Sequence, residues 1–465
     1  MRVLQVAHGF PPYSVGGVEY HVAQLTHALR AIDVHSDIFC RVPDPSLADY
    51  VVREEPLGQG SLLFMVVNNG VWGALAEQSY RDPRIGSIFD DFLKRRKPEL
   101  VHFHHMIALS GDLPERAVRQ GVPCVMTLHD YWLFCPRIQL LRPDGQVCSG
   151  PQEGAACAGC VLPAGPLGAA ERAARRIYGR LPLRARGNVK ALYRHLRVRR
   201  LQEKAGRADA SHARIDFFRR RLEHMRAQFA CVSWAIAPSQ ALVDRYSNAG
   251  FDAAKLVVMQ HGLAPMARRP ARRRPGGKPR FCFIGSVMAH KGLHVFLDAM
   301  ERLGPCAEGV IYGQRPDYDY AQAMERSLRR PGLTHVRWLG PYHPEDLPAI
   351  FAAADALVVP SIWPEAFSLV TREAFQAGVP VVASALGGMT EAISHEGNGL
   401  LVPPGDANAL GQAMERLVAE PGLLEQLRQG ARRTEVKEMS EYAGDIAKAY
   451  AAVRKTAAAL HDGTQ

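Results

Sequence analysis

Short apolar segments rich in β-branched residues alternate with helical patterns along the chain, and the alternation occurs in two separate series. The first series has apolar segments at 2–7, 62–67, 99–103 and 122–127, with helical patterns at 18–31 and 114–120. The second has apolar segments at 281–285, 308–312, 334–339, 355–359 and 379–383, each followed by a helical stretch. Such alternation is typical of βα units around a parallel sheet. We therefore predict an α/β chain with two doubly wound parallel-sheet domains facing each other across a cleft.

The predicted domain boundaries follow from the composition between the two series. Residues 264–279 contain five arginines together with glycines and prolines, a polar composition typical of a flexible linker. We predict a first domain over 1–263 and a second over 280–438. The final helical pattern, 439–465, could belong to either domain, and we expect it to pack back on the first.

Length and composition exclude several classes of protein. The 465 residues are 47% hydrophobic and 22% charged, close to the average for globular domains, so a disordered or collagen-like chain is excluded. No apolar run is long enough to cross a membrane, and the apolar stretch after Met1 is too short for a signal peptide. We expect a soluble cytoplasmic protein.

The net charge of +11 is concentrated in one segment. Residues 171–226 contain 18 lysines or arginines and five acidic residues, and they lie within a predicted basic helical insertion at 164–228. Apolar residues from Ile215 to Phe229 recur there at helical spacing between arginines. Basic amphipathic helices bind anionic membrane surfaces, but a solvated arm packed on its own domain has the same pattern. We favour peripheral contact with the cytoplasmic face of a membrane, and no groove-reading motif supports a nucleic-acid partner.

A glycine-containing loop opens the second series. Gly285 and Ser286 end an apolar strand pattern, and Lys291 precedes an amphipathic helical pattern. A diphosphate at such a turn meets free backbone N–H groups, the positive end of a helix and an ammonium group. A loop of this kind also occurs for purely structural reasons.

Two glutamates follow the apolar segment at 355–359. Glu365 and Glu373 are eight residues apart, so a helical conformation between them would place both on a similar face, about two turns apart. Both would then point into the crevice at the carboxyl end of the sheet, where open α/β sheets bind ligands. The alternative is a capping glutamate followed by a solvated one.

These motifs together resemble the retaining glycosyltransferases of family four, which have the two-domain GT-B architecture. The resemblance rests on the Glu-x7-Glu spacing, the 285–291 loop, Gly387-Gly388-Met389 and the segment 399–406. It implies that Glu365 faces the donor sugar and that Glu373 holds ribose hydroxyls. It also implies a diphosphate site that includes Gly285, Ser286, Lys291 and the backbone amides of Phe367, Ser368 and Leu369.

The amino-terminal half contains motifs consistent with this resemblance. Gly16 and Gly17 lie in a loop before the first helical pattern, and the family uses this loop to border donor and acceptor. His129 and Asp130 end a strand pattern, and the resemblance places His129 beside the reacting sugar. The nearby His102, His104 and His105 invite a metal-site interpretation, which we disfavour because strand alternation sends neighbouring side chains to opposite faces.

One position departs from the family pattern. Many members have arginine directly after the glycine of the phosphate loop, whereas this chain has Ser286. Lys291 would then be the single loop cation for the diphosphate unless His290 or Arg372 supplies another.

The predicted reaction is transfer of a sugar from a UDP- or GDP-sugar, with retention of anomeric configuration, to a glycan or lipid-linked acceptor in cell-surface polysaccharide biosynthesis. No Asp-x-Asp motif lies on a suitable loop, so we expect no catalytic metal. His129, Lys291 and Glu365 are the predicted catalytic residues. The alternatives are a sugar-nucleotide epimerase of similar fold and a polyanion- or membrane-binding protein that uses residues 171–226.

Four of the nine cysteines lie in a Gly- and Pro-containing loop predicted at 131–163. Their spacing is C-x12-C-x8-C-x2-C, with members Cys135, Cys148, Cys157 and Cys160. In a reducing compartment this spacing favours structural zinc; free thiols, disulfides and an iron–sulfur cluster stay open. Because the loop directly follows His129, a metal would stabilise the acceptor-side rim and take no part in catalysis.

Overall fold

Two sheets form the framework of the chain in a computed structural model that describes residues 1–70, 77–161, 209–267 and 277–462. The first sheet contains β1 (Arg2–Ala7), β2 (His35–Val42), β3 (Val52–Gly58), β4 (Ser61–Val67), β5 (Leu100–Phe103), β6 (Cys124–Thr127), β7 (Trp234–Ala237) and β8 (Leu256–Val258). The second contains β9 (Arg280–Ile284), β10 (Glu308–Tyr312), β11 (Val336–Gly340), β12 (Ala356–Val359), β13 (Val381–Ser384) and β14 (Gly399–Val402). The spatial orders are β3-β4-β2-β1-β5-β6-β7-β8 and β11-β10-β9-β12-β13-β14.

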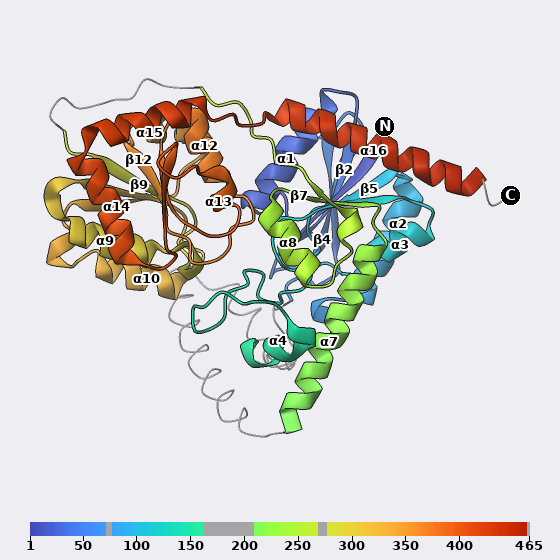
Figure 1. Ribbon diagram of the computed structural model, residues 1–465. Coiled ribbons are helices and arrows are strands. Elements are labelled where there is room, and N and C mark those ends of the chain that lie inside the picture. Colours follow the sequence, from blue (N-terminus) through green and yellow to red (C-terminus); the bar gives the residue numbers. More distant parts are fainter. Residues whose placement is uncertain (71–76, 162–208, 268–276, 463–465) are drawn as a thin grey trace.

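Apart from the antiparallel edge pair β3–β4, every pair of neighbouring strands in the described residues is parallel. Each sheet and its helices form one unit, and the two units stand side by side (Figure 1). The predicted fold class, two doubly wound α/β units, is confirmed. The basic helical insertion is only partly described, because residues 162–208 lie outside the described ranges.

Helices cover both faces of the first sheet. These helices are α1 (Gly17–Arg30), α2 (Pro83–Arg96), α3 (Leu113–Arg119), α7 (Asp209–Ala230), α8 (Gln240–Asn248) and α16 (Met439–Asp462), whereas α4 (Ala155–Cys160) packs on α7. Phe89 of α2, Met225 of α7 and Tyr246 of α8 belong to the core on one face. Leu25 of α1 and Ile446 of α16 belong to the core on the other.

The second sheet is also covered on both faces. Its helices are α9 (Leu293–Leu303), α10 (Tyr318–Ser327), α11 (Leu347–Ala352), α12 (Leu369–Ala377), α13 (Met389–Ala392), α14 (Ala407–Ala419) and α15 (Pro421–Arg433). Phe296 of α9 and Met414 of α14 pack on one face. Phe351 of α11 and Phe375 of α12 pack on the other. Both faces are buried, as the near-continuous apolar runs of parallel strands require.

The chain crosses from one unit to the other twice, and the two crossings lie side by side. The Leu263 N–H donates to the Lys437 carbonyl, and the Met439 N–H donates to the Leu263 carbonyl, with N···O distances of 3.0 and 2.8 Å. A Cβ at Gly262 would lie 2.5 Å from the Glu438 carbonyl oxygen, so the close approach requires glycine. After this crossing α16 runs across the first unit, as the red helix in Figure 1 shows.

Helix α7 differs from the membrane-surface helix expected for its part of the basic segment. Its apolar residues Phe218, Leu222, Met225 and Phe229 are at most 3% exposed, because they pack in the cores of the first unit. This apolar face is therefore not free to enter a lipid interface, and that part of the expectation is corrected. The rest of the basic segment, residues 171–208, lies outside the described ranges. No described helix is both long enough and apolar enough to span a bilayer.

Candidate active site

A cleft of ≈ 420 Å³ lies between the two units. Every residue predicted to bind the donor or to take part in catalysis lines it: Gly16, Gly17, His129, Gly285, Ser286, Lys291, Glu365, Phe367, Ser368, Leu369 and Glu373. The first sheet contributes the loops after β1 and β6, and the second contributes the loops after β9 and β12. The carboxyl ends of parallel strands thus meet at the cleft, as in other open α/β sheets.

The residues Lys291 and Glu365 form an ion pair in this cleft. The Lys291 ammonium and the Ser361 hydroxyl each donate to Glu365 Oε1 over 2.7 Å. Burial alone would raise the pKa of Glu365, but Lys291 and Ser361 hold it below the usual value. Glu365 is therefore an anion at neutral pH, and the ammonium also lies 5.3 Å from the Trp363 ring centre.

Glycine contacts hold this pair in place. Gly292 follows Lys291 with a φ of 73°, and a Cβ there would lie 1.9 Å from the Pro360 carbonyl oxygen. Such a close approach excludes any side chain and brings the Lys291 loop against the loop of Glu365. The Gly388 N–H donates to the Glu365 carbonyl over 2.7 Å, so a second loop holds the same residue from the other side.

Helix α12 begins between the two predicted glutamates. Residues 365–368 precede the helix, and Ser368 at its N-cap has a φ of 60°, a left-handed conformation that is rare outside glycine. The segment between Glu365 and Glu373 is therefore only partly helical, and both side chains line the cleft all the same. The first turn of α12 starts at the cleft, and the N–H groups that a helix leaves unpaired at this end suit an anion.

The acid Glu373 lies one turn further along α12. Burial raises its pKa from 4.5 to about 7. The structure gives this carboxylate no hydrogen-bonding side chain among the described residues, in contrast to Glu365. It is thus available to a ligand that can donate hydrogen bonds.

The two other side chains considered for the diphosphate, His290 and Arg372, add no positive charge to the lining of the cleft. Burial and the neighbouring Lys291 lower the pKa of His290 to about 4, so this ring is neutral. The Arg372 guanidinium lies 3.9 Å from the Phe367 ring centre and is 5% exposed, outside the lining of the cleft. Of the three candidates, Lys291 is the one that is both charged and part of the cleft lining.

The glycine loop of the first unit is supported by Glu19. The Ser14 hydroxyl donates to Glu19 Oε1 over 2.6 Å, and His8 Nε2 lies 3.2 Å from the same oxygen. Burial alone would raise the pKa of Glu19, but the His8 ring and the Ser14 hydroxyl lower it to about 2. A Cβ at Gly17, at the start of α1, would lie 3.6 Å from Cδ1 of Leu369 in the second unit.

The protonation of His129 follows from its neighbours. His104 Nε2 lies 2.7 Å from the Gln5 amide oxygen, which can only accept, so Nε2 carries the proton. His104 Nδ1 is then an acceptor, and the N–H at Nε2 of His129 donates a hydrogen bond to it over 3.2 Å. Burial and neighbouring histidines hold the pKa of His129 well below its usual value. His129 is therefore neutral, with Nδ1 free to accept a hydrogen bond.

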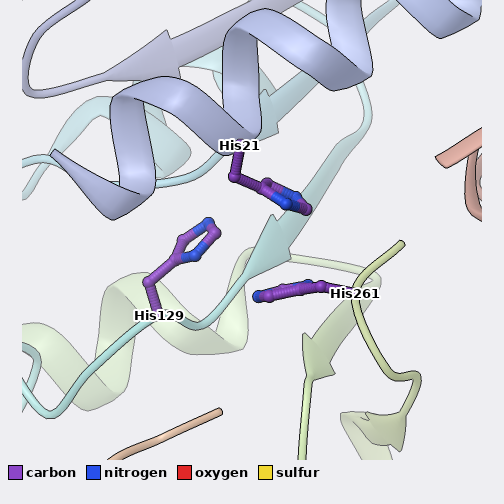
Figure 2. A group of neighbouring side chains, drawn as sticks. All are labelled: His21, His129 and His261. Carbon is purple, nitrogen blue, oxygen red and sulfur yellow. The ribbon is translucent and has the colours of Figure 1, made fainter. Parts of the chain in front are cut away.

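Two further histidines meet His129 at the cleft (Figure 2). His21 extends from α1 and His261 from the loop after β8, and one ring nitrogen of each lies within 4.8 Å of the others. Both ring nitrogens of His21 and Nδ1 of His261 are buried without a hydrogen-bond partner. Among the described residues, this trio is the group whose ligand atoms already lie close enough together to hold a metal ion. It equally suits hydroxyl groups of a bound sugar.

Sequence reasoning did not assign roles to His21 and His261. Each is a single histidine, and nothing in its local sequence indicates that it reaches the cleft. Of the strand-end histidines considered for a metal site, His104 contacts His129, whereas His105 Nε2 contacts Asp130 over 3.0 Å.

Comparisons with known proteins agree with this arrangement. Residues 267–434 match the family model described as glycosyl transferases group 1, and residues 15–148 match the model of glycosyltransferase family 4. A D-inositol 3-phosphate glycosyltransferase from Salinispora arenicola is 32% identical over an alignment of 223 residues that covers 41% of this chain and 47% of the relative. The chain thus spans about half the length of the curated relatives it matches.

Solved structures are similar over almost the whole chain. Sucrose-phosphate synthase from Thermosynechococcus elongatus has a TM-score of 0.65 and 21% identity, covering 98% of this chain and 99% of the other. HepE from Anabaena, solved in complex with UDP and glucose, has a TM-score of 0.62 and 16% identity, covering 97% and 99%. At these identities the likeness establishes the fold. With both family models matched and the fold shared, the chain belongs to the group 1 glycosyltransferases of the GT-B type.

Proposed function

We propose that this protein transfers a sugar from a nucleoside-diphosphate sugar, a UDP- or GDP-sugar, to a glycan or lipid-linked acceptor, with retention of anomeric configuration. The observation that carries the proposal is the joint position of Lys291, Glu365 and the start of α12 at one cleft. A cation, an anion and a helix N-terminus within one site suit a ligand with a diphosphate and a sugar.

The diphosphate is assigned to Lys291 and to the backbone amides at Phe367, Ser368 and Leu369. Negative charge develops on the diphosphate as the bond to the sugar breaks. Fixed N–H dipoles and an ammonium aimed at that charge stabilise the transition state without reorganisation. This fixed positive charge takes the place of a divalent ion, so we expect no catalytic metal at the diphosphate.

The donor sugar is assigned to Glu365 and His129, and the ribose to Glu373. A carboxylate and a neutral imidazole with a free Nδ1 both accept hydrogen bonds from hydroxyl groups. The acceptor hydroxyl attacks the anomeric carbon on the face that the diphosphate leaves, and a diphosphate oxygen takes its proton. The anomeric C–O bond to the diphosphate breaks as the new one forms, and no protein nucleophile is needed.

A donor panel tests this proposal. The purified protein is mixed with UDP-, GDP- and ADP-sugars, and both the unfolding temperature and the slow release of nucleoside diphosphate are measured. We expect one donor class to raise the unfolding temperature and to be hydrolysed slowly. NMR of the anomeric proton then shows whether the donor configuration is kept. If none of the donors binds, or if the product is inverted, the proposal is wrong.

A further inference from the structure

Four cysteines surround a second and smaller cavity, outside the cleft. Cys135 and Cys148 lie in the loop that follows His129, and Cys157 and Cys160 lie in α4. All four line one cavity of ≈ 20 Å³, and none forms a disulfide. Residues separated by up to 25 positions thus meet around a space that could hold a single ion.

The side chain of Arg221 supplies an independent observation at this cavity. Its guanidinium, 4% exposed, donates to the carbonyls of Trp132 and Leu133 over 2.5 and 3.1 Å. Its guanidinium carbon also lies 5.5 Å from the Trp132 ring centre. Among the ionisable side chains, Cys157 and Cys135 have the largest electrostatic effect on Arg221. Negative charge stabilises a buried cation, and thiolates at these cysteines would supply it.

We propose that Cys135, Cys148, Cys157 and Cys160 bind one Zn²⁺ ion as four thiolates. Each thiol releases its proton to solvent as its sulfur binds, so one Zn²⁺ replaces four protons and nothing is oxidised or reduced. The resulting site carries two negative charges. It therefore places negative charge beside Arg221, and four protein ligands leave the ion no open position for catalysis.

Ion binding requires the sulfurs to move closer together. In the described residues no three of the four Sγ atoms all lie within 4.8 Å of one another. Tetrahedral zinc with Zn–S bonds of about 2.3 Å places its sulfurs about 3.8 Å apart.

Zinc at this position would brace the loop beside the cleft. The Tyr131 hydroxyl donates to the Pro364 carbonyl over 2.8 Å, next to Glu365 of the second unit. The carbonyls of Trp132 and Leu133 hold Arg221. A metal at Cys135 therefore anchors a segment that contacts both units, which makes the cysteines positioning residues.

The test is the zinc content of the full chain, purified without chelator from cells supplied with zinc. We expect one zinc ion per chain in the wild type and well under one in the double variant Cys157→Ser/Cys160→Ser. The matched control is Cys231→Ser/Cys306→Ser, because these two free cysteines lie outside the cavity. The control should keep one zinc ion per chain.

Cobalt substitution identifies the ligands. Co²⁺ bound by thiolates gives intense near-ultraviolet charge-transfer absorption, whereas Co²⁺ on the histidine trio does not. If the double variant does not fold, the number of wild-type thiols that react with a thiol reagent is counted before and after chelation. An increase of four supports the proposal.

Several outcomes would overturn the proposal: wild-type zinc well below one per chain, zinc retained in the double variant, cobalt without charge transfer, or iron with inorganic sulfide. None of these measurements uses transferase activity, so failure of the zinc site is distinguishable from failure of the proposed function.

Discussion

The two walls of the cleft differ in charge and in how fully their polar groups are paired. On the second unit, Lys291 and Glu365 form a hydrogen-bonded ion pair, and glycine contacts hold their loops together. On the first unit, His21, His129 and His261 are neutral, and two of them have buried nitrogens without partners. One wall is charged and paired, and the other is neutral and partly unpaired.

This difference indicates what each wall is built to meet. A diphosphate is a constant, highly charged group, so a rigid wall with fixed charge suits it. Hydroxyl groups of a sugar are neutral and supply both donors and acceptors, which suits imidazoles that lack partners. We therefore expect substitutions on the charged wall to lower kcat/KM most, and those on the neutral wall to lower it less.

Replacing the cation of the charged wall should have the largest effect. Lys291→Ala removes the ammonium assigned to the leaving diphosphate, and we expect kcat/KM to fall about 10²–10³-fold, the usual loss for one preorganised donor. Initial rates with the donor found in the panel measure this. The matched control is Lys94→Ala, at a lysine on α2 whose side chain is 70% exposed, and it should leave kcat/KM unchanged. A loss within a few-fold for Lys291→Ala would contradict the assigned role.

The neutral wall can be disturbed without touching the cleft. His104→Phe removes the acceptor of the His129 Nε2 proton, and a buried N–H without a partner costs about 1–3 kcal/mol. We expect kcat/KM to fall about tenfold, and the ¹⁵N shifts of His129 to show mixed tautomers.

His102→Phe is the matched control for this prediction. His102 is equally buried and bonds Tyr450 and Thr127, with no hydrogen bond to His129. It should lower stability while leaving the His129 tautomer unchanged. Equal effects of both variants on the tautomer would refute the assignment of a special role to His104.

The fold could be predicted wherever local sequence carries the pattern. Strands β1, β4 and β10 are apolar runs, and their positions agree with the expected segments within one residue. Strand β2 was missed because its first half is polar. Asp37 within it is buried by Arg96 of α2, which donates to both of its oxygens over 2.8 and 2.9 Å. A tertiary contact, rather than a local pattern, makes that segment a strand.

The candidate site follows the same rule. Residues in compact motifs, such as Glu365 and Ser368, were identified from the sequence and lie at the cleft. The ion pair between Lys291 and Glu365 joins residues 74 positions apart, and no spacing encodes it. His21 and His261 were missed for the same reason, because only the folded chain brings them to His129.

The carboxylate of Glu373 gives a pH-dependent test of the charged wall. Its pKa is raised from 4.5 to about 7 in the folded chain, so ionisation lowers stability progressively between these values and fully above them. Glu373→Gln should therefore leave the unfolding temperature unchanged at pH 4.5 and raise it by about 2–4 °C at pH 8. Donor binding to the wild type should tighten as pH rises through about 7, because the carboxylate accepts ribose hydroxyls, and Glu373→Gln should lose that dependence.

The control for this pH test is Glu415→Gln, at an exposed glutamate of α14. It should show neither a pH-dependent gain in unfolding temperature nor a change in donor affinity. A Glu373→Gln variant that loses stability at pH 8 would mean that the carboxylate has a stabilising partner.

The smallest effect is expected where the two walls are joined. Glu391 of α13 accepts hydrogen bonds from the Gln240 and Ala241 N–H groups at the start of α8, over 2.9 and 2.7 Å. Glu391→Gln keeps an acceptor oxygen but removes the negative charge from that helix end, so kcat/KM should fall about two- to fivefold. Glu396→Gln breaks an exposed ion pair within the second unit and is the matched control. A loss for Glu391→Gln as large as that for Lys291→Ala would mean that the spacing of the walls, rather than the charge on one of them, limits the reaction.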